Sequence, residues 1–215
     1  MLDLIYGGGR VDRTVPEIEN LLAAFTPDGR RYLAYSPITP RDRLLPEDLA
    51  VTILINSRVG WRAFISVQDR GPHLDLGQLP GKPLECTSPN ERATVATLIA
   101  EVASWPGFGA SVTSKVLHKK RPDLIPILDN QAIFGAYMNP KWPSEPSKAE
   151  TVKAQPRILE ALEWIAYDLT RKENEVAWTA LQVKEPSRSR IDLFDMVWWT
   201  HFRQVEPVPP SAPKI

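Results

Sequence analysis

The chain has 215 residues, a length that suits one mid-sized domain or a compact domain with two lobes. Hydrophobic residues make up 43% of it and charged residues 24%, as in ordinary globular proteins. Lys and Arg number 26 and Asp and Glu also number 26, which argues against a protein that coats nucleic acid through a general positive excess. Any nucleic-acid contact must therefore come from a local basic face.

A single cysteine, Cys86, excludes an internal disulfide and any cluster held by several cysteines, such as an iron–sulfur cluster. The three histidines show no metal-ligand spacing, so no metal site is predicted. No segment approaches the roughly 18 apolar residues of a membrane span, and no membrane partner is expected. With no signal peptide, the lone thiol predicts a cytoplasmic protein.

The predicted elements are mainly α-helical. Residues 14–25 begin with a capping threonine and a proline and carry an apolar face, which predicts the first helix. The segment RRYLAYS after the next turn predicts a short strand or extended segment. Residues 47–57 predict a buried helix, because LAVTILI is apolar on nearly every side. Further helices are predicted at 59–68, 88–104, 110–120, 129–138 and about 156–171, 173–183 and 190–203.

These elements predict one compact helical domain over residues 1–204. The remaining residues, 205–215, are rich in proline and are predicted to be disordered.

The most informative stretch is WPGFGASVTSKVLHKKRPDLIPILD, which begins inside a helix–hairpin–helix pattern at about 92–120. Glycines in the PGFG turn would let a phosphate approach the backbone, and the N-terminus of the next helix would direct unpaired N–H groups toward that anion. The residues expected to contact a nucleic-acid backbone here are Gly107, Phe108, Gly109, Ser111 and Thr113. Alternatively the turn is purely structural, because Gly and Pro are common in any tight helix connection.

A single aspartate, Asp129, follows the second hairpin glycine by 20 residues and precedes a predicted helix. Breaking an N-glycosidic bond builds positive charge on the sugar, which a carboxylate at this position could stabilise, or it could activate a water molecule. The alternative is an ordinary N-cap, for which Asp is well suited. The two roles are compatible.

A basic run lies between the hairpin and the aspartate. Its members are Lys115, His118, Lys119, Lys120 and Arg121. They could form a phosphate-contacting edge beside the hairpin, or they could complement the dipole at the end of a helix.

The stretch resembles the helix–hairpin–helix and trailing aspartate of the helix–hairpin–helix DNA glycosylase superfamily. The resemblance implies a fold similar to the two-lobed glycosylase fold, duplex DNA bound through the hairpin edge, and Asp129 as the catalytic carboxylate. Members that also cleave the backbone carry a lysine where this chain has Ser111. Lyase activity is therefore not expected unless Lys115, one turn further on, reaches the pocket. Asn130 and Gln131 replace the superfamily's Thr-His.

Four residues are candidates for a base pocket or for a wedge that fills the gap left by a flipped base: Asn56, Arg58, Tyr137 and Trp199. For Trp199, a partly buried core position is the alternative. No cofactor is expected, although a monovalent cation could bind at the hairpin.

The segments LPEDLAVTILINSRV, WPGFGASVTSKVLHKKRPDLIPILD and SRIDLFDMVWW also look like an uncharacterised bacterial family that shares a helix–hairpin–helix followed by K-R-P-x-L-I-P-x-x-D. That resemblance implies no activity. It does imply that Arg121, Pro122 and Asp129 act as one unit.

Three hypotheses follow from the sequence. The first is a DNA-binding protein that acts as a monofunctional DNA glycosylase on a damaged or modified base. The second is a non-enzymatic module that binds DNA or protein on the same scaffold. The third is an enzyme for small nucleosides, which would keep Asp129 but not use the hairpin or the basic run. The sequence leaves open the base, the choice between DNA and RNA, and the oligomeric state.

Overall fold

The structure, a computed structural model, describes residues 2–4, 11–55, 57 and 59–205. This part of the chain is mainly helical, as the sequence predicts. The α-helices are α1 (Val15–Ala23), α2 (Pro27–Ala34), α3 (Trp61–Arg70), α4 (Pro89–Ser104), α5 (Ala110–Lys120), α6 (Gln155–Thr170), α7 (Glu175–Lys184) and α8 (Arg190–Val205). The 3₁₀ helices are η1 (Pro46–Ile55), η2 (Gly71–His73), η3 (Leu76–Gln78), η4 (Leu84–Cys86) and η6 (Lys172–Asn174), and η5 (Asn130–Tyr137) is a π-helix.

A short antiparallel pair, β1 (Leu2–Leu4) and β2 (Val11–Arg13), precedes the helices. The candidates Asn56 and Arg58 lie outside the described residues, as does the expected tail except for Val205. That residue is the last of α8, so the helix extends slightly beyond the expected domain boundary.

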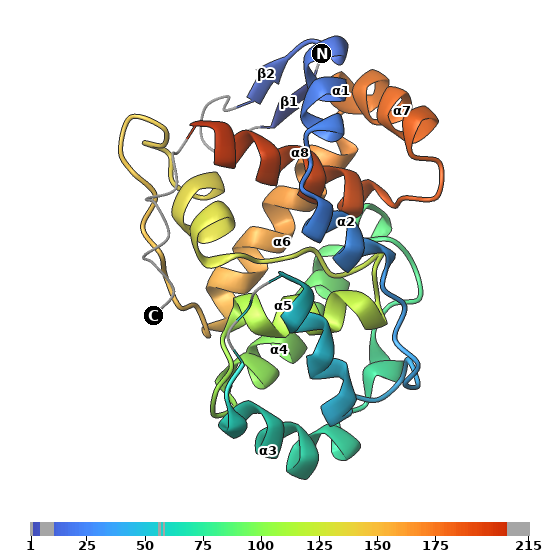
Figure 1. The fold of residues 1–215 in the computed structure, drawn as a ribbon, viewed down its shortest axis with the longest axis vertical. Coiled ribbons are helices and arrows are strands. Elements are labelled where there is room, and N and C mark those ends of the chain that lie inside the picture. Colours follow the sequence, from blue (N-terminus) through green and yellow to red (C-terminus); the bar gives the residue numbers. More distant parts are fainter. Residues whose placement is uncertain (1, 5–10, 56, 58, 206–215) are drawn as a thin grey trace.

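The helices form two groups that share one hydrophobic core (Figure 1). At one end, α1 packs against α7 and α8, so the beginning and the end of the described chain lie side by side. At the other end lie α3 and α4. Helix α6 packs along α4 and also contacts α7 and α8, while α5 packs against α4 and η1 in the middle of the molecule. No helix among the described residues combines the length and apolar character needed to cross a bilayer.

Two helices begin with a capping residue, Thr14 for α1 as the sequence predicts and Ser88 for α4. At the start of α1 the backbone N–H of Thr14 donates to Glu17 Oε2 at 2.8 Å. At the start of α4 the N–H of Ser88 donates to Glu91 Oε2 at 2.7 Å, and the N–H of Glu91 donates back to Ser88 Oγ at 3.3 Å. These reciprocal bonds satisfy backbone donors that have no partner within the helix.

The prediction of a strand or extended segment at RRYLAYS is wrong, because most of these residues belong to α2. Thr26 Oγ1 accepts the N–H of Gly29 at 3.2 Å, and Pro27 occupies the first turn. Helical geometry then places Tyr32 and Leu33 together in the interior, where both are buried. Their burial in the core outweighs the preference of Tyr for strands.

The segment LAVTILI is helical, but it is not buried on every side as the sequence predicts. It forms the 3₁₀ helix η1, which has three residues per turn. Glu47, Ala50 and Ile53 are exposed, and they align on one outer face. Ile53 is 78% exposed although it sits in an apolar run. The period of the helix therefore decides which apolar residues reach the core.

The hairpin between α4 and α5 is fixed by close packing against α3. Gly107 has φ +87°, and a Cβ there would lie 2.6 Å from the backbone nitrogen of Ala63. Ser66 Oγ donates to the carbonyl of Pro106 at 3.1 Å. Phe108 is buried, as expected for a ring that pins the turn.

Replacing Gly107 by Ala is expected to lower the free energy of unfolding by at least ~1–2 kcal/mol, because Ala is strained at positive φ and its methyl group would meet the backbone of α3. Urea denaturation measures the change. Gly81→Ala is the matched control, since a Cβ at Gly81 meets nothing within 4 Å. Equal losses in the two variants would contradict the packing described here.

Candidate functional site

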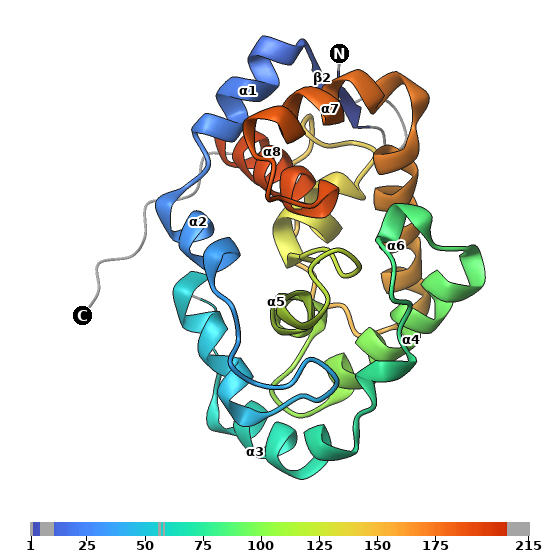
Figure 2. The same ribbon diagram turned by 90° about the vertical axis from the view of Figure 1, so that its right-hand side faces the viewer.

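A pocket of about 340 Å³ lies beside Asp129 and Lys115. Its walls come from α2, the end of η1, α5, the segment that leads into η5, and α8. Figure 2 shows α5 near the middle of the molecule, with α8 above it and α2 to the left. The lining side chains used below are Tyr32, Lys115, Ile127, Asp129, Asp195, Trp198 and Trp199.

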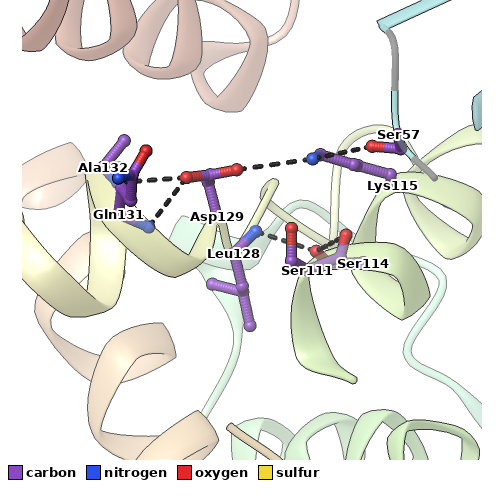
Figure 3. A network of polar contacts seen from close by, with 8 residues as sticks. All are labelled: Ser57, Ser111, Ser114, Lys115, Leu128, Asp129, Gln131 and Ala132. Atoms are coloured by element: carbon purple, nitrogen blue, oxygen red, sulfur yellow. Dashed lines mark hydrogen bonds and ion pairs between the residues drawn. The ribbon is translucent and has the colours of Figure 1, made fainter. Parts of the chain in front are cut away.

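Asp129 is both a helix cap and part of the pocket wall. Its Oδ1 accepts the N–H groups of Gln131 at 2.9 Å and Ala132 at 3.1 Å, which caps η5. Its Oδ2 points the other way and lies 3.3 Å from Lys115 Nζ (Figure 3). The side chain is 19% exposed, so the carboxylate is held on one side and open to the pocket on the other.

Lys115 brings an ammonium group into the same pocket. Its Nζ also donates to Ser57 Oγ at 3.0 Å, and its side chain is 13% exposed. Ser111 lies one turn earlier on the α5 face shown in Figure 3. Lys115 therefore reaches the pocket from the turn after the position where the resembled superfamily carries its lysine.

The polar contacts of α5 also set the position of Asp129. Ser114 Oγ accepts the N–H of Leu128 at 2.8 Å and donates to the carbonyl of Ser111 at 3.2 Å (Figure 3). Leu128 is buried, while Ile127 and Asp129 on either side of it line the pocket. The alternation of an extended backbone thus turns the carboxylate toward the pocket.

Two titratable residues in the wall, Tyr32 and Asp195, are not among the sequence candidates. The Tyr32 hydroxyl donates to the carbonyl of Lys115 at 2.7 Å, and burial, reinforced by the negative charge of Asp195, raises its pKa well above the usual range. Burial also raises the pKa of Asp195, although a hydrogen bond from the N–H of Ile127 at 3.3 Å opposes that shift. The motif SRIDLFDMVWW contains Asp195, but helical spacing alone does not show that it faces a pocket.

The aromatic candidates separate in the structure. Trp199 is half-buried and lines the pocket, beside Trp198, whose Nε1 donates to the carbonyl of Ala132 at 2.7 Å. Tyr137 is fully buried in the core instead, with its hydroxyl donating to Asp168 Oδ2 at 2.7 Å. The prediction that Tyr137 lines a base pocket is therefore wrong. The last helix supplies the aromatic wall.

Over residues 21–202 the chain matches a family described as Family of unknown function (DUF6308). It belongs to that family. Neither the comparison with curated proteins nor the comparison with solved structures found a match. The family description assigns no activity, so the likeness to DNA glycosylases stays a prediction.

The α5 end of the hairpin is covered by another part of the chain. The N–H of Ala110, one of the donors expected to point at a phosphate, donates to the carbonyl of Val152 at 2.8 Å. A Cβ at Gly109 would lie 3.0 Å from Thr151 Cγ2, and Thr113 is fully buried. The first N–H group of α5 and the hydroxyl of Thr113 are therefore not open to a phosphate, contrary to the expectation for this end of the hairpin. A monovalent cation at the hairpin stays a prediction.

The lysines of the basic run point into the protein. Lys120 Nζ lies 2.7 Å from Asp48 Oδ1, and both side chains are almost fully buried. Lys119 Nζ donates to the carbonyl of Leu33 at 3.1 Å and lies over the ring of Tyr32, and desolvation lowers its pKa to about 8. These two cations hold α5 against the segments that precede it in sequence.

The other members of the run have internal partners too. Arg121 donates to the carbonyls of Arg41 at 3.1 Å and Leu76 at 2.9 Å. His118 is fully buried, and its Nδ1 lies 2.8 Å from the carbonyl oxygen of Ile125. The solvent-facing basic edge expected beside the hairpin is therefore absent from residues 118–121, because their side-chain nitrogens contact oxygens of the protein instead.

Lys120→Met is expected to lower the free energy of unfolding by about 3–5 kcal/mol, because it leaves Asp48 charged and buried without its partner. Urea denaturation measures this. Lys141→Met, which removes an exposed lysine paired with Glu145, is the control and should leave stability nearly unchanged. A Lys120→Met protein that kept its stability but lost affinity for duplex DNA would instead favour the exposed-edge interpretation.

Proposed function

We propose that this protein hydrolyses the N-glycosidic bond of a nucleobase held in the pocket beside Asp129 and Lys115. The observation that supports the proposal most directly is the pairing of Asp129 with Lys115 at a pocket walled by aromatic side chains. Such a wall can stack on a planar base, and the carboxylate lies where the sugar of a bound nucleotide could be reached.

The reaction requires a group that stabilises positive charge on the sugar as the bond to the base breaks. Asp129 Oδ2 is suited to this because Oδ1 is held by two backbone N–H groups, so the carboxylate does not need to reorient during the reaction. Lys115 and Ser57 form a polar chain that holds Oδ2 in place. A water molecule between Asp129 and the sugar would be the nucleophile, and a free base and a sugar hydroxyl would be the products.

The contacts of Asp129 favour an enzyme over a binding module. A carboxylate that served only as a helix cap would be bonded to its own helix alone. Here it also pairs with a lysine from α5 at 3.3 Å, and both residues line the pocket. Charged groups that share a solvent-reachable pocket are more typical of chemistry than of a scaffold.

The class of substrate has two candidates. The resemblance to DNA glycosylases favours a damaged or modified base flipped out of duplex DNA, which would leave an abasic site. The second candidate is a free nucleoside, and the burial of Lys119, Lys120 and the α5 end of the hairpin supports it. A nucleoside needs neither a phosphate clamp nor a basic edge.

Base release from duplexes with modified bases and from free nucleosides, followed by chromatography, tests the proposal. Asp129→Asn is expected to slow release about 10²–10³-fold. Its side-chain oxygen can still accept the two N–H bonds of the cap, so the fold is retained. Failure of the wild-type protein to release any base, or full activity in Asp129→Asn, would contradict the proposal.

Borohydride trapping examines the role of Lys115 in the same reaction. We expect no covalent protein–DNA adduct, because Lys115 Nζ is already engaged by Asp129 and Ser57 and water attacks the sugar. Lys115→Arg, which retains the positive charge, is the control. An adduct in the wild-type protein that is missing in Lys115→Arg would show that the amine attacks instead and that lyase chemistry accompanies base release.

A further inference from the structure

A second carboxyl group, that of Asp195 on α8, faces the same pocket as Asp129. Asp195 is 8% exposed, and its Oδ2 accepts the N–H of Ile127 at 3.3 Å. Among the described residues, Oδ1 has no hydrogen-bond partner. Because Asp195 lines the pocket, this unpartnered oxygen is available to a bound molecule.

The two carboxyl groups lie close enough to act on one base. Asp195 accepts a hydrogen bond from the N–H of Ile127. Asp129 follows Ile127 by two residues in a segment outside the helices, so the Cα atoms of Ile127 and Asp129 are about 7 Å apart at most. Both Ile127 and Asp129 line the pocket, while Leu128 between them is buried. A planar base in the pocket could therefore contact Asp195 while its sugar reaches Asp129.

The surroundings of the two groups differ in kind. Asp129 has two backbone N–H donors and an ammonium group as partners. Asp195 has one N–H donor and is desolvated, and the nearby negative charge of Asp192 also raises its pKa. The titratable or charged groups around it are Tyr32 from α2, Lys115, His118 and Lys119 from α5, Asp129, and Asp192 and Arg203 from α8.

We propose that Asp195 is the general acid of the reaction and that the pocket takes a base that must gain a proton as it leaves, as a purine without an alkyl group on its ring nitrogens does. This inference rests on the proposed function and names its substrate class. A purine has ring nitrogen lone pairs away from its bond to the sugar, and a carboxyl group in the pocket wall with an unpartnered oxygen can donate a proton to one of them. Pairs of carboxyl groups in unlike environments divide acid and base roles in this way.

The step balances as follows. The bond between the sugar carbon and the base nitrogen breaks, and its electron pair stays on the base. The Asp195 proton moves to a ring nitrogen of the base, which leaves neutral. Water adds its oxygen to the sugar carbon and gives a proton to Asp129. Proton return to Asp195 through solvent restores both groups, so the net reaction consumes one water molecule.

Asp195→Asn tests this assignment, because the amide oxygen can still accept the N–H of Ile127 but the side chain has no acidic proton. Two leaving groups are compared, both as free nucleosides and in duplex DNA. Hypoxanthine needs a proton to leave as a neutral base. The cationic N7-methylguanine leaves neutral without one. We expect hypoxanthine release to fall about 10²–10⁴-fold in Asp195→Asn and release of N7-methylguanine to change little.

The pH profile gives a second readout. With hypoxanthine, kcat/KM should fall as pH rises through the pKa of Asp195, and this basic limb should be missing in Asp195→Asn. Asp192→Asn removes the neighbouring negative charge, so the limb should shift to lower pH instead of vanishing. A limb that persists unchanged in Asp195→Asn, or equal losses for both leaving groups, would overturn the assignment while leaving the proposed function intact.

Stability supplies a check that needs no substrate. The raised pKa means that the folded protein keeps a proton that the unfolded chain releases, so the free energy of unfolding falls as pH rises above about 4 toward the pKa of folded Asp195. Asp195→Asn should therefore raise Tm at pH 7, and the gain should shrink toward pH 4. An Asn variant with lower Tm at pH 7 would contradict the burial of a neutral carboxyl group.

If the wild-type protein releases no base at all, the proposed function fails, and the general-acid assignment fails with it.

Discussion

The burial of the last turn of α5 constrains the rest of this structure. A desolvated cation must have oxygen partners, and the partners of this turn come from several different parts of the chain. Lys120 pairs with Asp48 at the start of η1, and Lys119 bonds to the carbonyl of Leu33 at the end of α2. Arg121 reaches the carbonyl of Leu76 in η3. A helix held in this way has one position and one rotation, which sets the direction of Lys115 one turn earlier.

The pocket follows from that fixed rotation. Lys115 comes from the same helix, and the hydroxyl of Tyr32 bonds to its backbone carbonyl, so α2 forms one wall directly beside α5. Ser114 accepts a hydrogen bond from the N–H of Leu128, which fixes the segment that contains Asp129 next to α5. Asp129 then lies beside Lys115. Helix α8 closes the pocket with Trp199 and Asp195. Contacts that stabilise the fold therefore also position the candidate chemistry.

Asp129 and Asp195 show how one pocket can hold two unlike carboxyl groups. Asp129 sits at a helix N-terminus, where unpaired N–H groups and a lysine compensate its charge. Asp195 has a single N–H donor and lies among the aromatic residues of α2 and α8. Holding a partly compensated carboxyl group in this environment destabilises the protein. Such a cost is common at functional sites, where a group is needed in a state that water would not favour.

The sequence by itself determined the helical class, the cap at Thr14, and the position of Asp129 at the start of the helix that follows it, because caps, turns and periodicity depend on local backbone chemistry. It also named Lys115 as the residue that could reach the pocket although Ser111 stands where the resembled superfamily has a lysine. Only the tertiary structure decided that the lysines of the basic run face inward and that Asp195 joins Asp129, although these two lie far apart in the chain. The reason is physical. A charged residue is compatible with solvent or with a buried partner, and its own neighbours in sequence do not reveal whether a distant segment will supply one.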